Sequence, residues 1–381
     1  MTINRRKFLR NAGMAGLAAA TLPMHRNLAA TGHPAAPVNS ANVSEVQPNA
    51  AQRAWMHLGF GMFIHFGINT FYDKEWSDGS LDPMGFNPTQ IDTDQWCSVA
   101  KEAGMKYVVI TTKHHDGFAL WPSKHAEYTV AQSPFKGDVL ALLANSAQKY
   151  GLKLGFYYSI WDAHDPRMEN DWWAFMDFTY AQVEELLTGY GEIVELWLDG
   201  FWRRQRHGWE KQLEMIDGEA GFQEKNLQRD LDFIQAWRNE GAYWWQMDYF
   251  YQFVKSLQPN CLMMNNSTTA YPGVPLHPVD IRTGEKYTDV VSDQKIWNWL
   301  GQDIYLPLQI ETTMSTQGNE RFPTGNWFWH DWDHSVLTVE EIRKMLQTAS
   351  RLQANLLLNV GISDKGLLRE VDKTTLTSLR K

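Results

Sequence analysis

The sequence predicts an α/β protein that folds as a (β/α)8-like barrel of the TIM type. Short apolar runs alternate with segments of helical periodicity, which is typical of βαβ units around a parallel sheet. The runs are apolar throughout rather than at every second position, as expected when helices cover the sheet. A doubly wound open sheet is the alternative. No G-x-G-x-x-G or P-loop motif follows the first run, which weakens the case for nucleotide binding.

Each element is recognised by its apolar run or by its end signals. One predicted helix stops at Gly104, another stops at Gly151, and Thr338 with Glu341 forms a capping box before a third. The polar region 201–241, with its basic cluster at 203–206, is expected to be mostly solvated helix on the barrel rim rather than a phosphate site. The predicted strands are 60–67, 106–115, 153–159, 192–200 and 354–361, and the predicted helices are 94–103, 137–151, 172–190 and 342–353.

The composition is that of an acidic globular protein rich in aromatic residues. Of 381 residues, 44% are hydrophobic and 21% are charged, which is ordinary for a folded chain and wrong for a disordered one. The net charge of −9, without a long basic run in the body, argues against a nucleic-acid partner. Two cysteines, Cys97 and Cys261, exclude a disulfide scaffold, and their spacing does not indicate whether they pair. The 18 Trp, 14 Tyr and 18 Phe residues suit surfaces that stack on sugars, although most will be core.

The first 49 residues are predicted to lie outside the barrel. Residues 1–30 combine Arg5 and Arg6 with a short apolar stretch and a small-residue end, which is typical of a twin-arginine export signal. An amphipathic first helix is the alternative. Residues 31–49 are expected to be a linker, and 50–381 the catalytic domain. The apolar stretch is too short to span a membrane, so we expect an exported protein, periplasmic or secreted, without a membrane span.

Polar side chains follow the ends of the first four predicted strands, where barrel enzymes build their active sites. Asp199 stands out because an acid after an apolar run is costly to bury unless it is hydrogen-bonded. Its alternative role is a helix cap. The triplet His114, His115, Asp116 also raises the possibility of a metal site. Adjacent strand residues point to opposite faces, however, and no metal-ligand spacing is present, so we expect no metal. The polar strand-end residues are His65, His114, His115, Asp116, Tyr157, Tyr158 and Asp199.

Several motifs together closely resemble the glycoside hydrolase family 29 α-L-fucosidases. These motifs are FGMFIHFG, EWSDG, KHHDGFALW, LGFYYS and ELWLDGFW, and the similarity resumes at NLLLNVG. The resemblance implies a (β/α)8-like barrel that removes terminal α-L-fucose with retention and without a metal or other cofactor. It implies that Asp199 of the LW-x-D motif is the nucleophile. The substrate-binding residues that it implies are His65, Glu75, Trp76, His114, His115, Tyr157 and Trp197.

The general acid/base is carried by a variable loop in this family. The family motif D-F-x-T-x-E corresponds here to DIRTGE, which makes Glu285 the candidate. Glu311 in LQIETT matches the family's W-E motif near the sugar and is the second choice. Trp327 in NWFWH is a candidate platform for the sugar. An arginine found in some members is absent, since MMNNSTT occupies its region.

The resulting expectation is a retaining exo-α-L-fucosidase that acts on fucosylated glycans or oligosaccharides. Retaining hydrolysis needs two carboxyl groups, one that attacks the anomeric carbon and one that protonates the leaving oxygen. The alternatives are a glycosidase for an L-galactose-type sugar and a catalytically silent carbohydrate-binding barrel. Because the chain ends soon after NLLLNVG, we do not expect the C-terminal β-sandwich that many family members carry.

Overall fold

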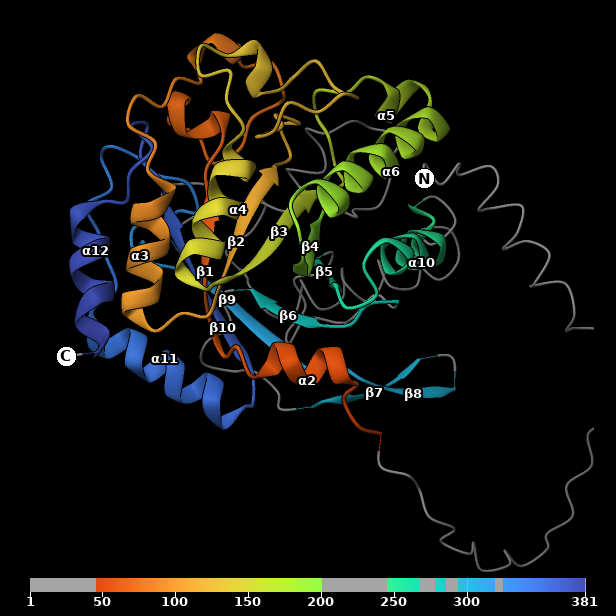
Figure 1. Ribbon diagram of the computed structural model, residues 1–381, viewed down its shortest axis with the longest axis vertical. Coiled ribbons are helices and arrows are strands. Elements are labelled where there is room, and N and C mark those ends of the chain that lie inside the picture. The colour runs from red at the N-terminus through yellow and green to blue at the C-terminus, as the bar shows by residue number, and fades with distance from the viewer. Residues whose placement is uncertain are drawn as a thin grey trace, which may run out of the picture. The chain divides into compact units, whose positions relative to one another are not determined.

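Eight parallel strands form one sheet that curves almost closed into a barrel (Figure 1). The computed structural model describes residues 46–200, 245–266, 278–285, 294–299, 301–318 and 325–380. Pro48–Lys381 belong to one compact unit. The predicted export signal, most of the predicted linker and the polar region 201–241 lie outside the described residues.

The strands follow one another around the barrel in chain order. In a doubly wound sheet the strand order reverses at a switch point. Here the order is β5-β4-β3-β2-β1-β10-β9-β6, and the first strand pairs in parallel with the last. The predicted barrel is therefore confirmed. The eight strands are β1 Phe60–His65, β2 Tyr107–Lys113, β3 Lys153–Ser159, β4 Ile193–Asp199, β5 Leu262–Asn266, β6 Arg282–Glu285, β9 Leu308–Thr313 and β10 Asn355–Gly361.

One junction of the barrel, between β5 and β6, is joined without a strand ladder among the described residues. Hydrogen bonds to Met263 hold it together. The backbone N–H groups of Asp280 and Ile281 donate to the Met263 carbonyl at 2.7 and 3.2 Å. The Met263 N–H donates to the Asp280 carboxylate at 2.8 Å. We call this junction the β5–β6 seam.

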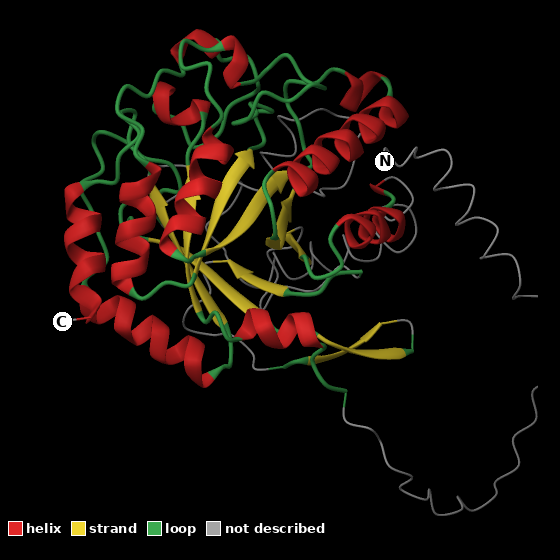
Figure 2. Ribbon diagram, in the orientation of Figure 1, coloured by secondary structure: helices red, strands yellow, loops and turns green. Residues whose placement is uncertain are grey.

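Helices surround the sheet, and the end signals that were read from the sequence are observed (Figure 2). The α3 and α4 helices end at Gly104 and Gly151, which have φ values of 92° and 66° and thus adopt the left-handed conformation that glycine tolerates best. The capping box of Thr338 and Glu341 begins α11. The helices are α2 Ala50–Met56, α3 Thr93–Ala103, α4 Val139–Tyr150, α5 Arg167–Asn170, α6 Trp172–Gly189, α10 Met247–Leu257, α11 Val339–Arg351 and α12 Glu370–Thr377.

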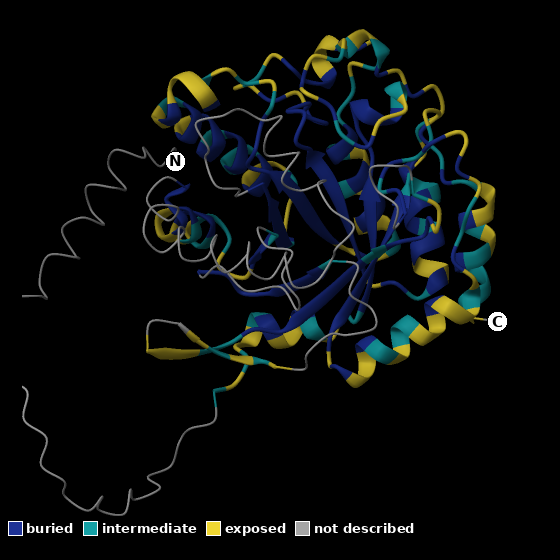
Figure 3. Cartoon of the chain, turned by 180° about the vertical axis from the view of Figure 1, so that it is seen from behind, coloured by how far each residue is buried: buried dark blue, intermediate teal, exposed yellow. Residues whose placement is uncertain are grey.

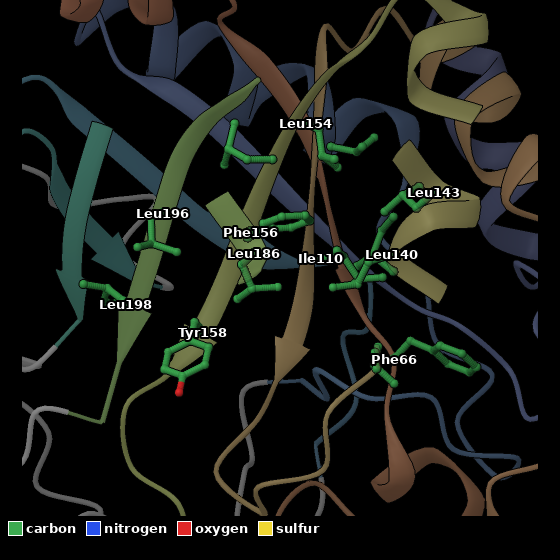
Figure 4. Close-up of a cluster of buried hydrophobic side chains, with 14 of the residues drawn as sticks. Phe66, Ile110, Leu140, Leu143, Leu154, Phe156, Tyr158, Leu186, Leu196 and Leu198 are labelled. Carbon is green, nitrogen blue, oxygen red and sulfur yellow. The ribbon is translucent and has the colours of Figure 1, made fainter. Parts of the chain in front are cut away.

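The main hydrophobic core lies between the sheet and the helices. Figure 4 shows Leu140 and Leu143 of α4 and Leu186 of α6 near Ile110 and Phe156 of the sheet. Figure 3 shows that the strands of the barrel are buried while the helices keep exposed outer sides. Each of these strands is covered on one face by the helices and on the other by the barrel interior, which explains why the sequence shows apolar runs without alternation.

Helix α2, which the sequence analysis did not predict, closes the N-terminal end of the barrel. Trp55 is buried, and its indole N–H donates to the carboxylate of Glu195, which lies inside the barrel on β4. Gln309 of β9 donates to both Glu195 oxygens at 3.0 Å. Burial raises the pKa of Glu195 to about 7, against the opposing effect of these hydrogen bonds. The Gln52 amide donates to the carbonyls of Asp280 and Tyr305, both at 2.9 Å, and so ties α2 to the β5–β6 seam.

Further features complete the described part of the chain. An antiparallel hairpin, β7 Ile296–Trp299 and β8 Gln302–Tyr305, stands between β6 and β9. Cys97 and Cys261 are both buried free thiols, which settles the question that their spacing left open. None of the described helices has both the length and the apolar character needed to cross a membrane.

Candidate active site

The carboxyl of Asp199 lies at the carboxyl end of β4, largely buried. The Tyr157 hydroxyl donates to its Oδ2 at 3.0 Å, and the Gly200 N–H donates to its Oδ1 at 2.8 Å. Gly200 has a φ of 79°, and a Cβ at this position would lie 2.5 Å from the Cβ of Trp161. Burial, and then the charge of Glu285, raises the pKa of Asp199 to about 8. Asp199 therefore occupies a site in which a carboxyl readily holds a proton.

Glu285 and Asp199 are connected through one amide, that of Asn266. Asn266 ends β5 and is the register partner of Asp199 on β4. Its Nδ2 donates to Glu285 Oε2 at 2.7 Å, and its side chain also hydrogen-bonds to Asp199, which opposes the rise in the pKa of that carboxyl. The two carboxyls are thus within reach of the same side chain. The charge of Glu285 disfavours the charged form of Asp199.

Glu311 lies opposite Glu285 in the β6–β9 register but in a different environment. Its side chain is fully buried. Oε2 accepts hydrogen bonds from the Thr283 hydroxyl at 2.7 Å and the Gly284 N–H at 3.1 Å, and Oε1 accepts one from the Trp197 indole at 3.4 Å. Burial raises the pKa of Glu311 well above its ordinary value. Its oxygens are thus bonded to the protein, whereas Glu285 is only half-buried.

His114 and His115 lie side by side just beyond the end of β2. The β2–β3 register shifts between Thr111 and Lys113, and the two imidazole rings lie 4.2 Å apart. Burial lowers the pKa of both histidines well below the ordinary value, so both rings are neutral near pH 7. Among the described residues, Nδ1 of His114 has no hydrogen-bond partner. An orphaned buried nitrogen of this kind is suited to a ligand hydroxyl.

The proton positions of His115 and His65 follow from their neighbours. The Ser159 hydroxyl donates to the Trp161 carbonyl, so it accepts from His115 Nδ1 at 2.7 Å. His115 Nε2 then faces the Asp199 carboxyl at 3.6 Å.

Asn359 determines which nitrogen of His65 carries a proton, as Ser159 does for His115. Its Nδ2 donates to the Trp327 carbonyl at 2.8 Å, and its Oδ1 lies 2.6 Å from His65 Nδ1. That nitrogen therefore carries a proton.

Aromatic rings line the same end of the barrel. The Tyr157 ring stacks on Trp197 at 5.1 Å and on His114 at 5.5 Å. The Trp327 ring lies 5.1 Å from His65, and the Trp76 ring lies 4.5 Å from His115. Rings that surround polar groups in this way suit a ligand with one apolar and one hydroxylated face.

Glu75 joins this cluster from the segment after β1. Its two oxygens accept hydrogen bonds from the backbone N–H groups of Trp327 and Phe328, both at 2.9 Å. The structure therefore brings together all the side chains that the sequence analysis singled out for the site. They are Asp199, Glu285, His65, Glu75, Trp76, His114, His115, Tyr157, Trp197, Glu311 and Trp327.

The three consecutive residues His114, His115 and Asp116 are not arranged as a metal-ligand set. Asp116 accepts hydrogen bonds from Asn69 Nδ2 at 3.0 Å and from the Phe118 N–H at 2.7 Å. Its oxygens thus serve the loop that carries Glu75, while His115 is engaged with Ser159. Within the described ranges, no group of three or more His, Cys, Asp or Glu side chains is placed to hold a metal ion.

Sequence reasoning missed Asn266, Asn359 and His330. Asn266 lies in MMNNSTT, the segment that lacks the arginine of some family members. His330 lies in NWFWH beside Trp327, and its partner Glu75 is 255 positions away in the sequence. The one available signal was position: Asn266 and Asn359 both lie at the ends of barrel strands, where polar residues indicate a site.

Comparison with known proteins assigns the chain to a family. The sequence model of a family described as Alpha-L-fucosidase matches residues 28–381. Alpha-L-fucosidase 1 of Arabidopsis thaliana is 30% identical over 338 residues, which cover 85% of this chain and 58% of the plant protein. The alpha-L-fucosidase of Branchiostoma floridae is 33% identical over 186 residues, which cover 39% of this chain and 41% of that protein. The chain thus spans little more than half the length of the plant relative.

Solved structures give the same assignment. A glycoside hydrolase 29 family member from an unknown rumen bacterium superposes with a TM-score of 0.67 at 28% identity, over 87% of this chain and 56% of that one. Alpha-L-fucosidase isoenzyme 1 from Paenibacillus thiaminolyticus gives a TM-score of 0.63 at 25% identity, over 87% of this chain and 74% of that one. Because the family match extends over nearly the whole chain and the barrel agrees with it, the chain belongs to the alpha-L-fucosidase family, glycoside hydrolase family 29.

Proposed function

We propose that the protein is a retaining exo-α-L-fucosidase that removes terminal α-L-fucosyl residues from glycans or oligosaccharides. The observation that carries the proposal is the pair Asp199 and Glu285, linked by Asn266 at the carboxyl end of the barrel. A double displacement needs one charged and one protonated carboxyl. Because burial, and then the charge of Glu285, raises the pKa of Asp199, this carboxyl must give up its proton before it can act as the nucleophile.

In the first step, Asp199 attacks the anomeric carbon while Glu285 transfers its proton to the departing glycosidic oxygen. The bond to the aglycone breaks and a fucosyl ester of Asp199 forms. In the second step, Glu285 takes a proton from water, the resulting oxygen nucleophile attacks the same carbon, and the ester bond to Asp199 breaks. Fucose leaves with its original anomeric configuration, and both carboxyls return to their first states.

Glu285 is proposed as the acid/base in preference to Glu311. Glu311 is fully buried and receives hydrogen bonds from Thr283, Gly284 and Trp197. A group that must exchange a proton with substrate and water needs access to both. Glu285 lies half-buried on the neighbouring strand, in contact with the side chain that also reaches Asp199.

The remaining side chains are proposed to bind the sugar. His65, His114 and His115 would bind fucose hydroxyls, and the orphaned Nδ1 of His114 supports this role. Tyr157, Trp197, Trp76 and Trp327 would pack against the methyl group and the apolar face, and Glu75 would accept from a hydroxyl.

We also propose export through the twin-arginine signal at 1–30. Expression of the whole chain and of a variant with both Arg5 and Arg6 replaced by Lys tests this proposal. The wild type should reach the periplasm or medium in a processed form, and the variant should stay inside.

Hydrolysis of an aryl α-L-fucoside tests the activity. The wild type should cleave it and release α-fucose first, as seen by NMR, and should cleave the matching L-galactoside more slowly. Asp199→Asn should bind fucose yet turn over at least about a thousandfold more slowly, which corresponds to roughly 4 kcal/mol of transition-state stabilisation.

Three results would contradict the proposal, each in a different way. No hydrolysis by the wild type would favour the carbohydrate-binding barrel. Faster cleavage of the galactoside would favour the L-galactose-type enzyme. Initial release of β-fucose would exclude retention.

A further inference from the structure

His330 lies between two carboxylates at the edge of the candidate site. Its Nε2 is 2.9 Å from Glu75 Oε1, and its Nδ1 is 2.5 Å from Asp73 Oδ1. The His330 ring is buried, whereas the Asp73 side chain is 60% exposed. Two ring nitrogens that both face carboxylate oxygens are satisfied only by an imidazolium, since the neutral ring has a single N–H.

The charge balance around His330 agrees with this geometry. Burial opposes the positive charge, but hydrogen bonds and attraction from Glu75 and Asp73 outweigh it and raise the pKa of His330. Both carboxylates come from the segment after β1. On the loop that carries His330, Asp333 directs its carboxylate to Ser315, Asn326 and Ser335 instead.

Glu75 connects His330 to the residues that are proposed to bind the sugar. Besides His330, its oxygens accept the backbone N–H groups of Trp327 and Phe328. An ionised carboxylate has about four acceptor positions, so three protein donors leave about one for a substrate hydroxyl. The Trp327 carbonyl is in turn held by Asn359, which also holds His65. Four side chains from distant parts of the chain thus form one connected network.

We propose that His330 and Asp73 are positioning residues of the fucose pocket. The imidazolium, anchored on the solvent side by Asp73, keeps Glu75 directed at the substrate and holds the Trp327 backbone beside His65. This inference rests on the proposed function in one respect: the ligand of the pocket is fucose. Neither residue touches the sugar, so their effect is on substrate affinity more than on the chemical step.

The sign of the pH dependence follows from the donor count. As pH rises through the pKa of His330, the ring loses one N–H and one carboxylate loses its donor. Fucose affinity should therefore fall at alkaline pH. Asp73→Asn removes one of the charges that raise this pKa, so the fall should begin at lower pH. At pH 5, where His330 is charged in both proteins, the two affinities should agree.

The experiment compares wild type with Asp73→Asn and His330→Gln. L-Fucose affinity is measured by calorimetry, and kcat and KM on an aryl α-L-fucoside, from pH 5 to pH 9. In Asp73→Asn, the alkaline fall in fucose affinity should begin about one pH unit lower than in the wild type. In His330→Gln, KM should rise about tenfold with a smaller change in kcat, and the fall in fucose affinity at alkaline pH should be lost. His125→Gln, which removes a partly exposed histidine that faces Glu185 at 3.7 Å away from the pocket, is the matched control and should change neither.

The outcomes separate the two proposals. A wild type that neither binds fucose nor cleaves fucosides refutes the proposed function, and this inference with it. If the wild type is active, and Asp73→Asn and His330→Gln leave KM and the pH dependence of fucose affinity unaltered, the positioning role alone is refuted. This holds even if the variants have a lower Tm. The NMR titration of the His330 ring is a readout without substrate: a pKa at or below 6.5 in the wild type would also refute it.

Discussion

Glu195 should make the free energy of unfolding depend on pH in a way that a single substitution removes. Its carboxyl is fully buried inside the barrel, where it accepts hydrogen bonds from Trp55 and Gln309. Burial raises its pKa from the ordinary 4.5 to about 7. Between these two values the folded protein holds a proton that the unfolded chain has lost. Glu195 therefore contributes most to stability below pH 4.5, and this contribution is lost as pH rises through 7.

The magnitude follows from the gap between the two pKa values. At about 1.4 kcal/mol for each pH unit, the gap amounts to about 3 kcal/mol, most of it lost between pH 5 and pH 8. Glu195→Gln has nearly the same shape and no charge, so this dependence should vanish in the variant. Any constant effect of the substitution on packing would offset both ends of the pH range equally.

Urea unfolding of both proteins at pH 5, 6, 7 and 8 measures the effect. The quantity to compare is the free energy of unfolding of the wild type minus that of Glu195→Gln, which should fall by about 2 to 3 kcal/mol from pH 5 to pH 8. Asp199 and Asp116, whose pKa values burial also raises, cancel in this difference. Glu192→Gln, which replaces an exposed carboxylate paired with Lys153, controls for surface charge. A difference that stays constant with pH would refute the reasoning.

Three other predictions concern the candidate active site and the N-terminal end of the barrel, which α2 closes. Glu285→Gln should nearly abolish hydrolysis of a fucosyl disaccharide. It should affect the first step with a dinitrophenyl fucoside much less, because that phenolate leaves without a proton. If Glu311→Gln shows this dependence on the leaving group instead, Glu311 is the acid/base. Dialysis against EDTA should leave the rate unchanged, since Asp116 is bonded to Asn69 and Phe118 rather than directed at the histidines; loss that one divalent cation restores would contradict this. Trp55→Phe should lower the free energy of unfolding, measured with urea, by about 2 kcal/mol because the hydrogen bond to Glu195 is lost. The kcat on an aryl fucoside should not change. An unaltered urea midpoint would show that this hydrogen bond adds little to stability.

The parts of the fold that the sequence predicted are those with a local signal. The strands that end at His65, Lys113 and Asp199 are apolar runs, and α11 begins with a capping box that any reader of the sequence can find. The side chains of the site could be named because strand ends and family motifs mark them. Local patterns thus suffice where one element dictates both its structure and its role.

Other elements could not be predicted because their stability comes from tertiary contacts. The β6 strand is only four residues, RTGE, and its Thr283 and Gly284 hydrogen-bond to Glu311 rather than form an apolar face. Helix α2 is seven residues long and depends on Trp55 reaching Glu195, 140 positions away. His330 and Glu75 acquire their relation only when the loops after β9 and β1 meet. No periodicity or spacing records such pairs.

The β5–β6 seam has a consequence for the retaining reaction proposed above. Asp199 lies on one side of it, through β4 and β5, and Glu285 lies on the other. Local opening of a barrel is favoured where backbone pairing is sparse, and the two carboxyls lie on opposite sides of such a junction. Retaining and inverting geometries differ by only a few ångströms, about 5–5.5 Å against about 6.5–9.5 Å. Asn266 of β5 donates to Glu285 of β6 across this junction, and Gln52 of α2 holds the Asp280 carbonyl on the β6 side. In the retaining mechanism proposed above, the hydrogen bond from Asn266 to Glu285 would therefore help to keep the two carboxyls too close for water to enter between them.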